Sequence, residues 1–98
     1  MLTCCYEIRA VDDLREYVYE TICEHYQLQS DAFRMTERIL RRGGKPCGIH
    51  FCLHGPTAVK FTAIWETDHN QVLFYSSTGE RILRTQLLGS LDLERMAA

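Results

Sequence analysis

Apolar and polar residues alternate with a period of two from residue 47 onwards, and this pattern constrains the fold more than any other feature. In residues 47–54 the apolar side is formed by Ile49, Phe51 and Leu53. In residues 57–66 it is formed by Val59, Phe61, Ala63 and Trp65. Such alternation is typical of β-strands with one buried face, so we expect two strands that share an apolar face.

The turn between these two strands decides their register. A three-residue turn of His54, Gly55 and Pro56 would bring the two apolar sides together. A two-residue turn would instead place Phe61 beside His50. A slip of one residue moves every side chain to the other face, so the apolar pattern predicts the three-residue register.

Three more segments have the character of strands. Residues 72–75 are apolar on both sides, and residues 81–87 follow after a turn. The two-sided apolar strand predicts a second covered face, with either the N-terminal segment or a second copy of the protein as the cover. Residues 2–9 also alternate, which fits a short strand or an irregular lead-in.

Residues 12–27 give the clearest helical pattern. An apolar stripe at helical spacing consists of Val11, Leu14, Val18, Ile22 and Tyr26. Asp12 or Asp13 can cap the start, where the helix dipole favours acidic side chains. The sequence therefore predicts one long helix with this stripe against the sheet.

Residues 30–42 fit two interpretations. Read as a helix, the segment turns Ala32, Met35 and Ile39 inward and ends well at Gly43. Read as a strand, it leads through a Gly43–Gly44 hairpin loop into the strand that follows at once. We favour the strand slightly and keep the helix as the alternative.

Together these segments predict an α+β fold. Its expected form is one long N-terminal helix packed on an antiparallel β-meander of four to five strands, because a two-layer arrangement covers the apolar face of the sheet. The alternative is two helices followed by a four-stranded meander. The chain has 98 residues, which suits a single domain over residues 1–98.

The net charge of −2 conceals a strong asymmetry along the chain. Residues 32–60 carry six basic residues and one acidic residue, between acidic flanks. The basic block consists of Arg34, Arg38, Arg41, Arg42, Lys45 and Lys60. Arginine suits phosphate and carboxylate, so one hypothesis is an RNA- or anion-binding surface. A solvated basic edge is the plainer interpretation, and a pI of about 6.0 argues against a constitutive nucleic-acid binder.

Acidic residues on the predicted helix form the opposite feature. Glu16, Glu20 and Glu24 recur every fourth residue, so they line one side of the helix and repel one another. A solvated helix face is the ordinary interpretation of such a stripe. The functional interpretation is a docking face for a basic partner, weakened by salt.

The strand 47–54 carries a polar run that could bind metal. His50, Cys52 and His54 share one side of it, and imidazole and thiolate suit zinc. The spacing matches no common structural zinc motif, and the plainer interpretation is the less apolar face of a sheet. A thiol-dependent site centred on the same three residues is a weaker hypothesis.

The remaining features bear on function mostly by exclusion. We find no P-loop spacing around Gly43 and Gly44 and no nucleophile elbow, and a chain of this length leaves little room for a catalytic cleft. Five cysteines, the lack of a signal sequence and the lack of an apolar run of membrane-spanning length indicate a cytoplasmic protein. We expect a binding protein rather than an enzyme: a protein-interaction or regulatory module that self-associates, without a required cofactor.

Overall fold

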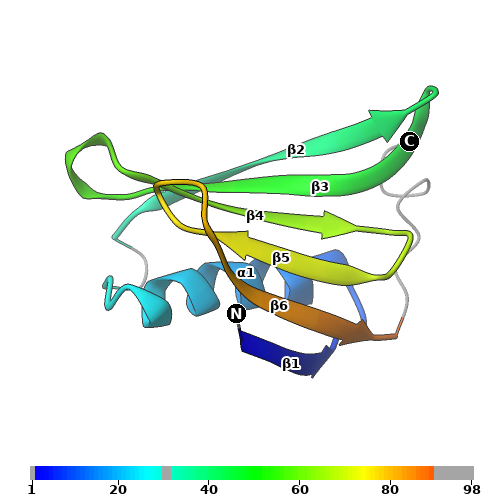
Figure 1. Ribbon diagram of the computed structural model, residues 1–98, viewed down its shortest axis with the longest axis horizontal. Helices are drawn as coiled ribbons and strands as arrows, with labels where there is room; N and C mark the ends of the chain where they lie inside the picture. Colours follow the sequence, from blue (N-terminus) through cyan, green and yellow to red (C-terminus); the bar gives the residue numbers. More distant parts are fainter. Residues whose placement is uncertain (1, 30–31, 90–98) are drawn as a thin grey trace.

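The computed structural model describes residues 2–29 and 32–89. Within them lie one α-helix, one short 3-10 turn and six strands (Figure 1). Their bounds are β1 Leu2–Glu7, α1 Val11–His25, β2 Arg34–Arg42, β3 Lys45–His54, η1 Pro56–Ala58, β4 Lys60–Glu66, β5 Gln71–Tyr75 and β6 Arg81–Leu88. The α+β class with one long helix is confirmed, but the sheet has six strands rather than four to five.

All six strands form one sheet in the order β1-β6-β5-β4-β3-β2. Neighbouring strands from β2 to β6 are antiparallel, as the predicted meander requires. Strand β1 pairs with β6 in parallel, so the sheet is mixed. The purely antiparallel expectation was wrong because this pairing joins opposite ends of the chain, and no local turn signals it.

Residues 34–42 form strand β2, so the alternative with a second helix is wrong for this segment. Pairing with β3 runs from Arg34 opposite His54 to Arg42 opposite Lys45. The tight turn at Gly43 and Gly44, both with positive φ, allows this hairpin. Cross-strand pairing along the full strand outweighs a modest local preference for helix.

The predicted apolar face is the inner face of the sheet, the one that α1 covers. Ile49, Phe51 and Leu53 lie opposite Trp65, Ala63 and Phe61 respectively. The shared apolar face is as predicted, but the individual pairs differ from those of a three-residue turn. The connecting turn spans residues 55–59 instead of 54–56, but both lengths are odd, so the faces match. From the helix, Leu14, Val18 and Ile22 pack onto this face and are buried with it.

One expectation for α1 and one for the N-terminal segment need correction. The N-cap is Ala10 rather than an aspartate, and the carboxylate of Asp13 accepts hydrogen bonds from the backbone N–H groups of Arg9 and Ala10 at 3.1 and 3.2 Å. Strand β1 lies beside β6 at the edge of the sheet, so the N-terminal segment does not cover the second face.

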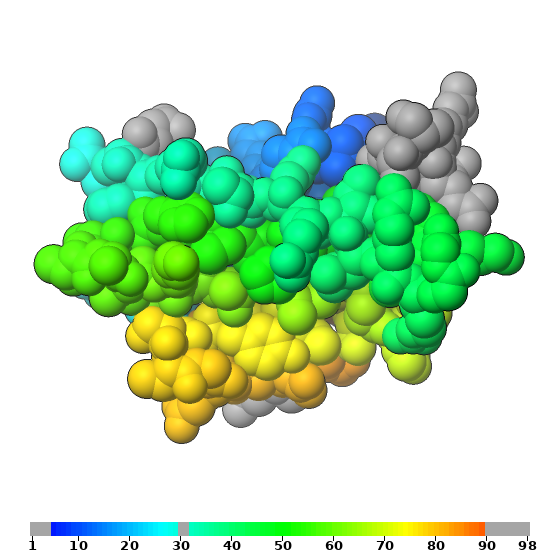
Figure 2. All heavy atoms as spheres, turned by 90° about the horizontal axis from the view of Figure 1, so that it is seen from above, coloured from blue at the N-terminus to red at the C-terminus, as the bar shows by residue number. Residues whose placement is uncertain are grey.

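The second, outer face of the sheet has no helix or strand of the described chain upon it. In Figure 2, which looks onto the β2 edge, α1 in blue and cyan lies on one side of the sheet, and the β5–β6 turn in yellow projects on the other. The register places Leu73, Ile64 and His50 side by side on this outer face. The described residues therefore leave one broad sheet surface open to a ligand or partner.

Candidate functional site

The structure divides the predicted basic block between two places. Arg34, Arg38 and Lys60 belong to the outer face of the sheet, because they stand in register with His54 and His50. Arg41, Arg42 and Lys45 lie instead at the β2–β3 hairpin, where all three side chains are exposed. The block therefore does not act as one continuous patch.

Cross-strand register arranges the outer face in rows. One row runs Arg34, His54, Lys60; the next runs Thr36, Cys52, Thr62, Tyr75, Arg81; the third runs Arg38, His50, Ile64, Leu73, Arg84. Arg81 and Arg84 were not among the predicted site residues; they and Tyr75 join this surface because β6 and β5 pair beside β4. Basic residues thus lie towards the margins of the rows, with apolar and aromatic residues between them.

The newly added arginines are positioned by neutral partners. Arg84 donates to Oε1 of Gln71 at 2.9 Å. Arg81 donates to the Tyr75 hydroxyl at 3.1 Å, and its guanidinium carbon lies 5.5 Å from the centre of the Tyr75 ring. Because these contacts involve no carboxylate, both guanidinium groups keep their positive charge available to an anion.

His50, Cys52 and His54 lie on the outer face as predicted but do not converge. Alternate residues of a strand are about 6.6 Å apart along it, and the His54 ring nitrogen is 3.2 Å from the hydroxyl of Thr36. Among the described residues no group of three His, Cys, Asp or Glu side chains could hold a metal ion. Partial burial, and then the nearby charge of Arg38, lower the pKa of His50.

Four cysteines whose side chains the structure describes are free thiols, in different environments. Cys23 is buried against the core, Cys47 and Cys52 are half-buried, and Cys5 is exposed. No partner base lies beside Cys52 in the hydrogen bonds found within residues 2–29 and 32–89, so the thiol-dependent hypothesis gains no geometric support.

A groove of about 610 Å³ lies between α1 and the edge strand β2. Its lining consists of Asp12, Arg15, Glu16, Tyr19, Glu20, Phe33 and Met35. The groove therefore has one wall on α1 and one at the start of β2. The Tyr19 hydroxyl links α1 to the segment directly before β2. It donates to the Phe33 carbonyl at 2.7 Å and accepts from the Phe33 N–H at 3.3 Å.

The groove is acidic. Arg15 donates to both carboxylate oxygens of Glu37, at 2.8 and 2.6 Å, and to Asp12 at 2.6 Å. The hydrogen bond with Glu37 contributes most to raising the pKa of Arg15. Since Arg15 is already paired, the carboxylates of Glu16 and Glu20 dominate what a ligand would meet. Of the predicted acidic stripe, Glu24 is exposed and does not line the groove.

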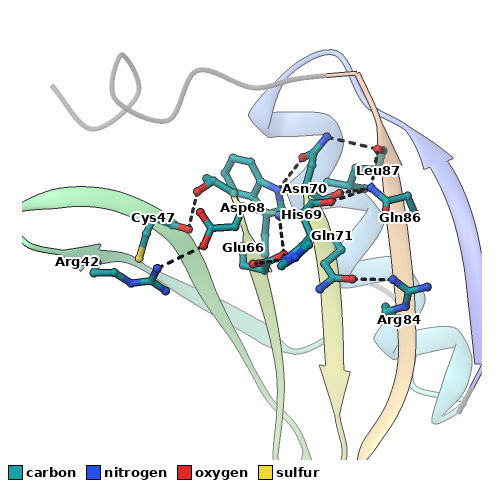
Figure 3. Close-up of polar contacts among 12 residues, drawn as sticks. Arg42, Cys47, Glu66, Asp68, His69, Asn70, Gln71, Arg84, Gln86 and Leu87 are labelled. Carbon is teal, nitrogen blue, oxygen red and sulfur yellow. Dashed lines mark hydrogen bonds and ion pairs between the residues drawn. The ribbon is translucent and has the colours of Figure 1, made fainter.

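A second polar cluster, which sequence reasoning did not find, holds the β4–β5 turn against the end of β6 (Figure 3). Asn70, at a φ of 50°, accepts from the Trp65 indole N–H at 3.1 Å and donates to the Gly89 carbonyl at 2.6 Å. Gln86 donates to the carbonyls of His69 and Asn70 at 2.9 and 3.1 Å. These side-chain groups satisfy backbone and core partners, so the cluster stabilises the turn.

Comparisons with family models, curated proteins and solved structures found no significant match. In the described part of the chain no helix is long and apolar enough to cross a membrane.

Proposed function

We propose that this chain is a protein-interaction module that self-associates head to tail. In this arrangement the acidic groove of one copy takes the basic β2–β3 hairpin of the next. The observation that carries the proposal is the groove itself, in which Tyr19, Phe33 and Met35 offer apolar surface. Beside it lie the carboxylates of Glu16 and Glu20, which form no ion pair with the residues that the structure describes.

Charge complementarity favours the hairpin as the occupant. Arg41, Arg42 and Lys45 are exposed at a turn of two glycines, and the hairpin extends beyond the rest of the sheet (Figure 1). The one ion pair found there joins Arg42 to Asp68 at 3.3 Å, with both side chains largely exposed, so it would be given up at little cost. The groove volume lies within the range of about 300–1,000 Å³ of pockets that hold drug-sized ligands, which is room for a few side chains.

The geometry favours contact between copies rather than within one. Met35 and Arg41 are six residues apart on one strand, a separation of about 20 Å. A rigid strand therefore holds the hairpin away from the groove of its own chain. A contact between two different surfaces of identical molecules is heterologous, and it forms rings or open chains.

Sedimentation velocity of the whole protein tests this proposal. At about 0.05 M salt we expect concentration-dependent association, and at about 0.5 M salt we expect monomer, because screening weakens exposed charge pairs. The double variant Glu16→Gln/Glu20→Gln should remain monomeric at low salt. Glu24→Gln is the matched control on the same helix and should behave as the wild type.

Mixing two deficient variants gives the sharpest outcome. A groove variant, Glu16→Gln/Glu20→Gln, and a hairpin variant, Arg41→Gln/Arg42→Gln, should each be monomeric alone. Mixed, they retain one intact groove and one intact hairpin, so they should form a 1:1 dimer and nothing larger. A monomeric wild type at both salt concentrations, or a mixture that stays monomeric, would refute the proposal.

A further inference from the structure

The outer face of the sheet is a second charged surface, separate from the groove and the hairpin. It collects side chains from strands that are distant in the sequence, among them Arg38 of β2, Lys60 of β4 and Arg84 of β6. We infer that this outer face binds single-stranded nucleic acid. The phosphates would contact the basic residues, and the bases would stack on the apolar and aromatic side chains between them.

Basic residues outnumber acidic residues on the outer face. The basic residues of the outer face are Arg34, Arg38, Lys60, Arg81 and Arg84. The register adds two acidic residues: Glu7, opposite Leu88, which pairs with Arg9 at 3.5 Å, and Glu66, which stands opposite Gln71 on β5. The Glu66 carboxylate accepts from the His69 backbone N–H at 2.9 Å and lies 3.1 Å from the His69 ring. The described outer face is therefore strongly positive, although the whole chain is acidic.

The described residues provide no acidic partners for the basic side chains of the outer face. No ion pair found among the described residues involves Arg34, Arg38, Lys60, Arg81 or Arg84. Arg15, by contrast, is held by two carboxylates. Like charges gathered on one surface repel one another, so a bound polyanion would relieve a repulsion that the chain leaves uncompensated.

The surface between the basic residues is apolar and aromatic. Ile64, Leu73 and Tyr75 are only half-buried, although no described helix or strand covers them. Bases stack on aromatic rings and on guanidinium planes, and Arg81 already lies over the ring of Tyr75. This layer suits a nucleobase better than it suits an acidic peptide, which offers carboxylates but no flat rings.

The dimensions of the face suit a short single strand. Arg38 and Arg84 stand four strand intervals apart in the same row, about 19 Å at the usual spacing. Arg34 and Arg38 lie four residues apart along β2, about 13 Å. A strand of several nucleotides could contact both margins, as in other sheet platforms for single strands, whereas a rigid duplex could reach the apolar and aromatic side chains between them only with its backbone.

Fluorescence anisotropy with a labelled 12-nucleotide oligouridylate tests the inference. At about 0.1 M salt we expect binding whose logarithm falls with the logarithm of salt concentration, at a slope of about −0.7 for each phosphate contact. The variant Arg38→Gln/Arg84→Gln should lose affinity at least about tenfold and show a shallower slope. Tyr75→Leu should lose about tenfold with an unchanged slope, because stacking carries no charge.

Matched controls separate this face from other positive charges. Arg9→Gln and Arg42→Gln remove exposed guanidinium groups outside the outer face and should leave affinity within about twofold. Arg38→Lys/Arg84→Lys keeps the charge and should retain most of the affinity. Thermal unfolding of each variant shows whether it is folded. If Arg38→Gln/Arg84→Gln does not fold, Arg38→Lys/Arg84→Lys still tests the outer face.

Three results would overturn the inference. The first is a flat titration of the wild type with the oligonucleotide. The second is equal loss in the outer-face variants and in Arg42→Gln. The third is equally tight binding of a poly-glutamate of matched charge, which would make the face a docking surface for acidic protein. The self-association variants Glu16→Gln/Glu20→Gln should bind the oligonucleotide as the wild type does, so the two proposals fail independently.

Discussion

The two faces of the sheet are built from the same strands but obey different constraints. On the inner face, Phe51, Leu53 and Trp65 are fully or almost fully buried under α1. On the outer face their neighbours in sequence, such as Cys52 and Ile64, are half-buried with no described element above them. The inner face shows how packing holds the fold together, while the outer face is free to carry charge for a ligand.

The largest expected effect tests this contrast on two adjacent residues of β3. Phe51→Ala should lower the free energy of unfolding by about 3–5 kcal/mol, since it leaves a cavity in the core. Cys52→Ala, one residue further and on the other face, should cost less than about 1 kcal/mol. Urea unfolding followed by tryptophan fluorescence measures both. Equal costs would mean that the outer face is packed in solution.

The second test concerns Gly48 of β3, where the backbone of β4 approaches closely. A Cβ on Gly48 would overlap the backbone carbonyl oxygen of Trp65. Gly48→Ala should therefore cost about 1–3 kcal/mol, because the β3–β4 backbone must shift. Thr62→Ala on the neighbouring strand is the control and should cost less than about 1 kcal/mol. If Gly48→Ala unfolds at the same urea concentration as the wild type, the two strands can separate there without penalty.

The third test compares two tyrosines near the inner layer. The Tyr26 hydroxyl is buried without a hydrogen-bond partner among the described residues, while its ring stacks on Phe61 with centroids 4.1 Å apart. Tyr26→Phe keeps the stacking and should raise the free energy of unfolding by about 1 kcal/mol. Tyr19→Phe removes the bonds to Phe33 and should lower it by about as much. A destabilised Tyr26→Phe protein would show that this hydroxyl has a partner in solution.

The inner face was predictable from the sequence, and the outer face was not. The alternation around Phe51 and Phe61 specifies the strands and the face that is buried, because a slip of one residue would expose the apolar side chains. It does not specify the exact register, because a shift of two residues keeps the faces matched. The outer surface depends on which strands become neighbours, and nothing near Arg84 in the sequence indicates that it will share a row with Arg38. For the same reason, residues 2–9 could be read as a short strand or an irregular lead-in, but nothing indicated that they would pair in parallel with β6.

The groove was half predictable. Helical spacing placed Glu16, Glu20 and Glu24 on one line, but the packing angle of α1 against the sheet decides which of them meet β2. Phe33 and Met35 could complete the groove only once residues 34–42 formed a strand instead of a helix. The sequence does not determine the angle at which α1 crosses the sheet. The set of side chains that α1 and β2 bring together in the groove could therefore not be predicted.

The smallest expected effect, and the one specific to the outer face, is a pH dependence at His50. Its pKa lies below the ordinary value of 6.5 because partial burial, and then Arg38, disfavour the charged ring. Well above pH 6.5 the ring is neutral in both the folded and the unfolded chain, so it adds no pH dependence to the free energy of unfolding. As the pH falls through 6.5 the unfolded chain takes up the proton first, so stability should decrease towards about pH 5.

His50→Asn should make this acid-induced decrease in melting temperature shallower, and Arg38→Gln should do so to a smaller degree, since it removes only the second cause. Melting temperatures measured by circular dichroism between about pH 7.5 and 5 supply the comparison. Superimposable profiles for wild type and His50→Asn would mean that the ring is fully hydrated. A bound oligonucleotide should make the acid-induced decrease shallower, because its phosphates would favour the protonated ring that partial burial and Arg38 disfavour.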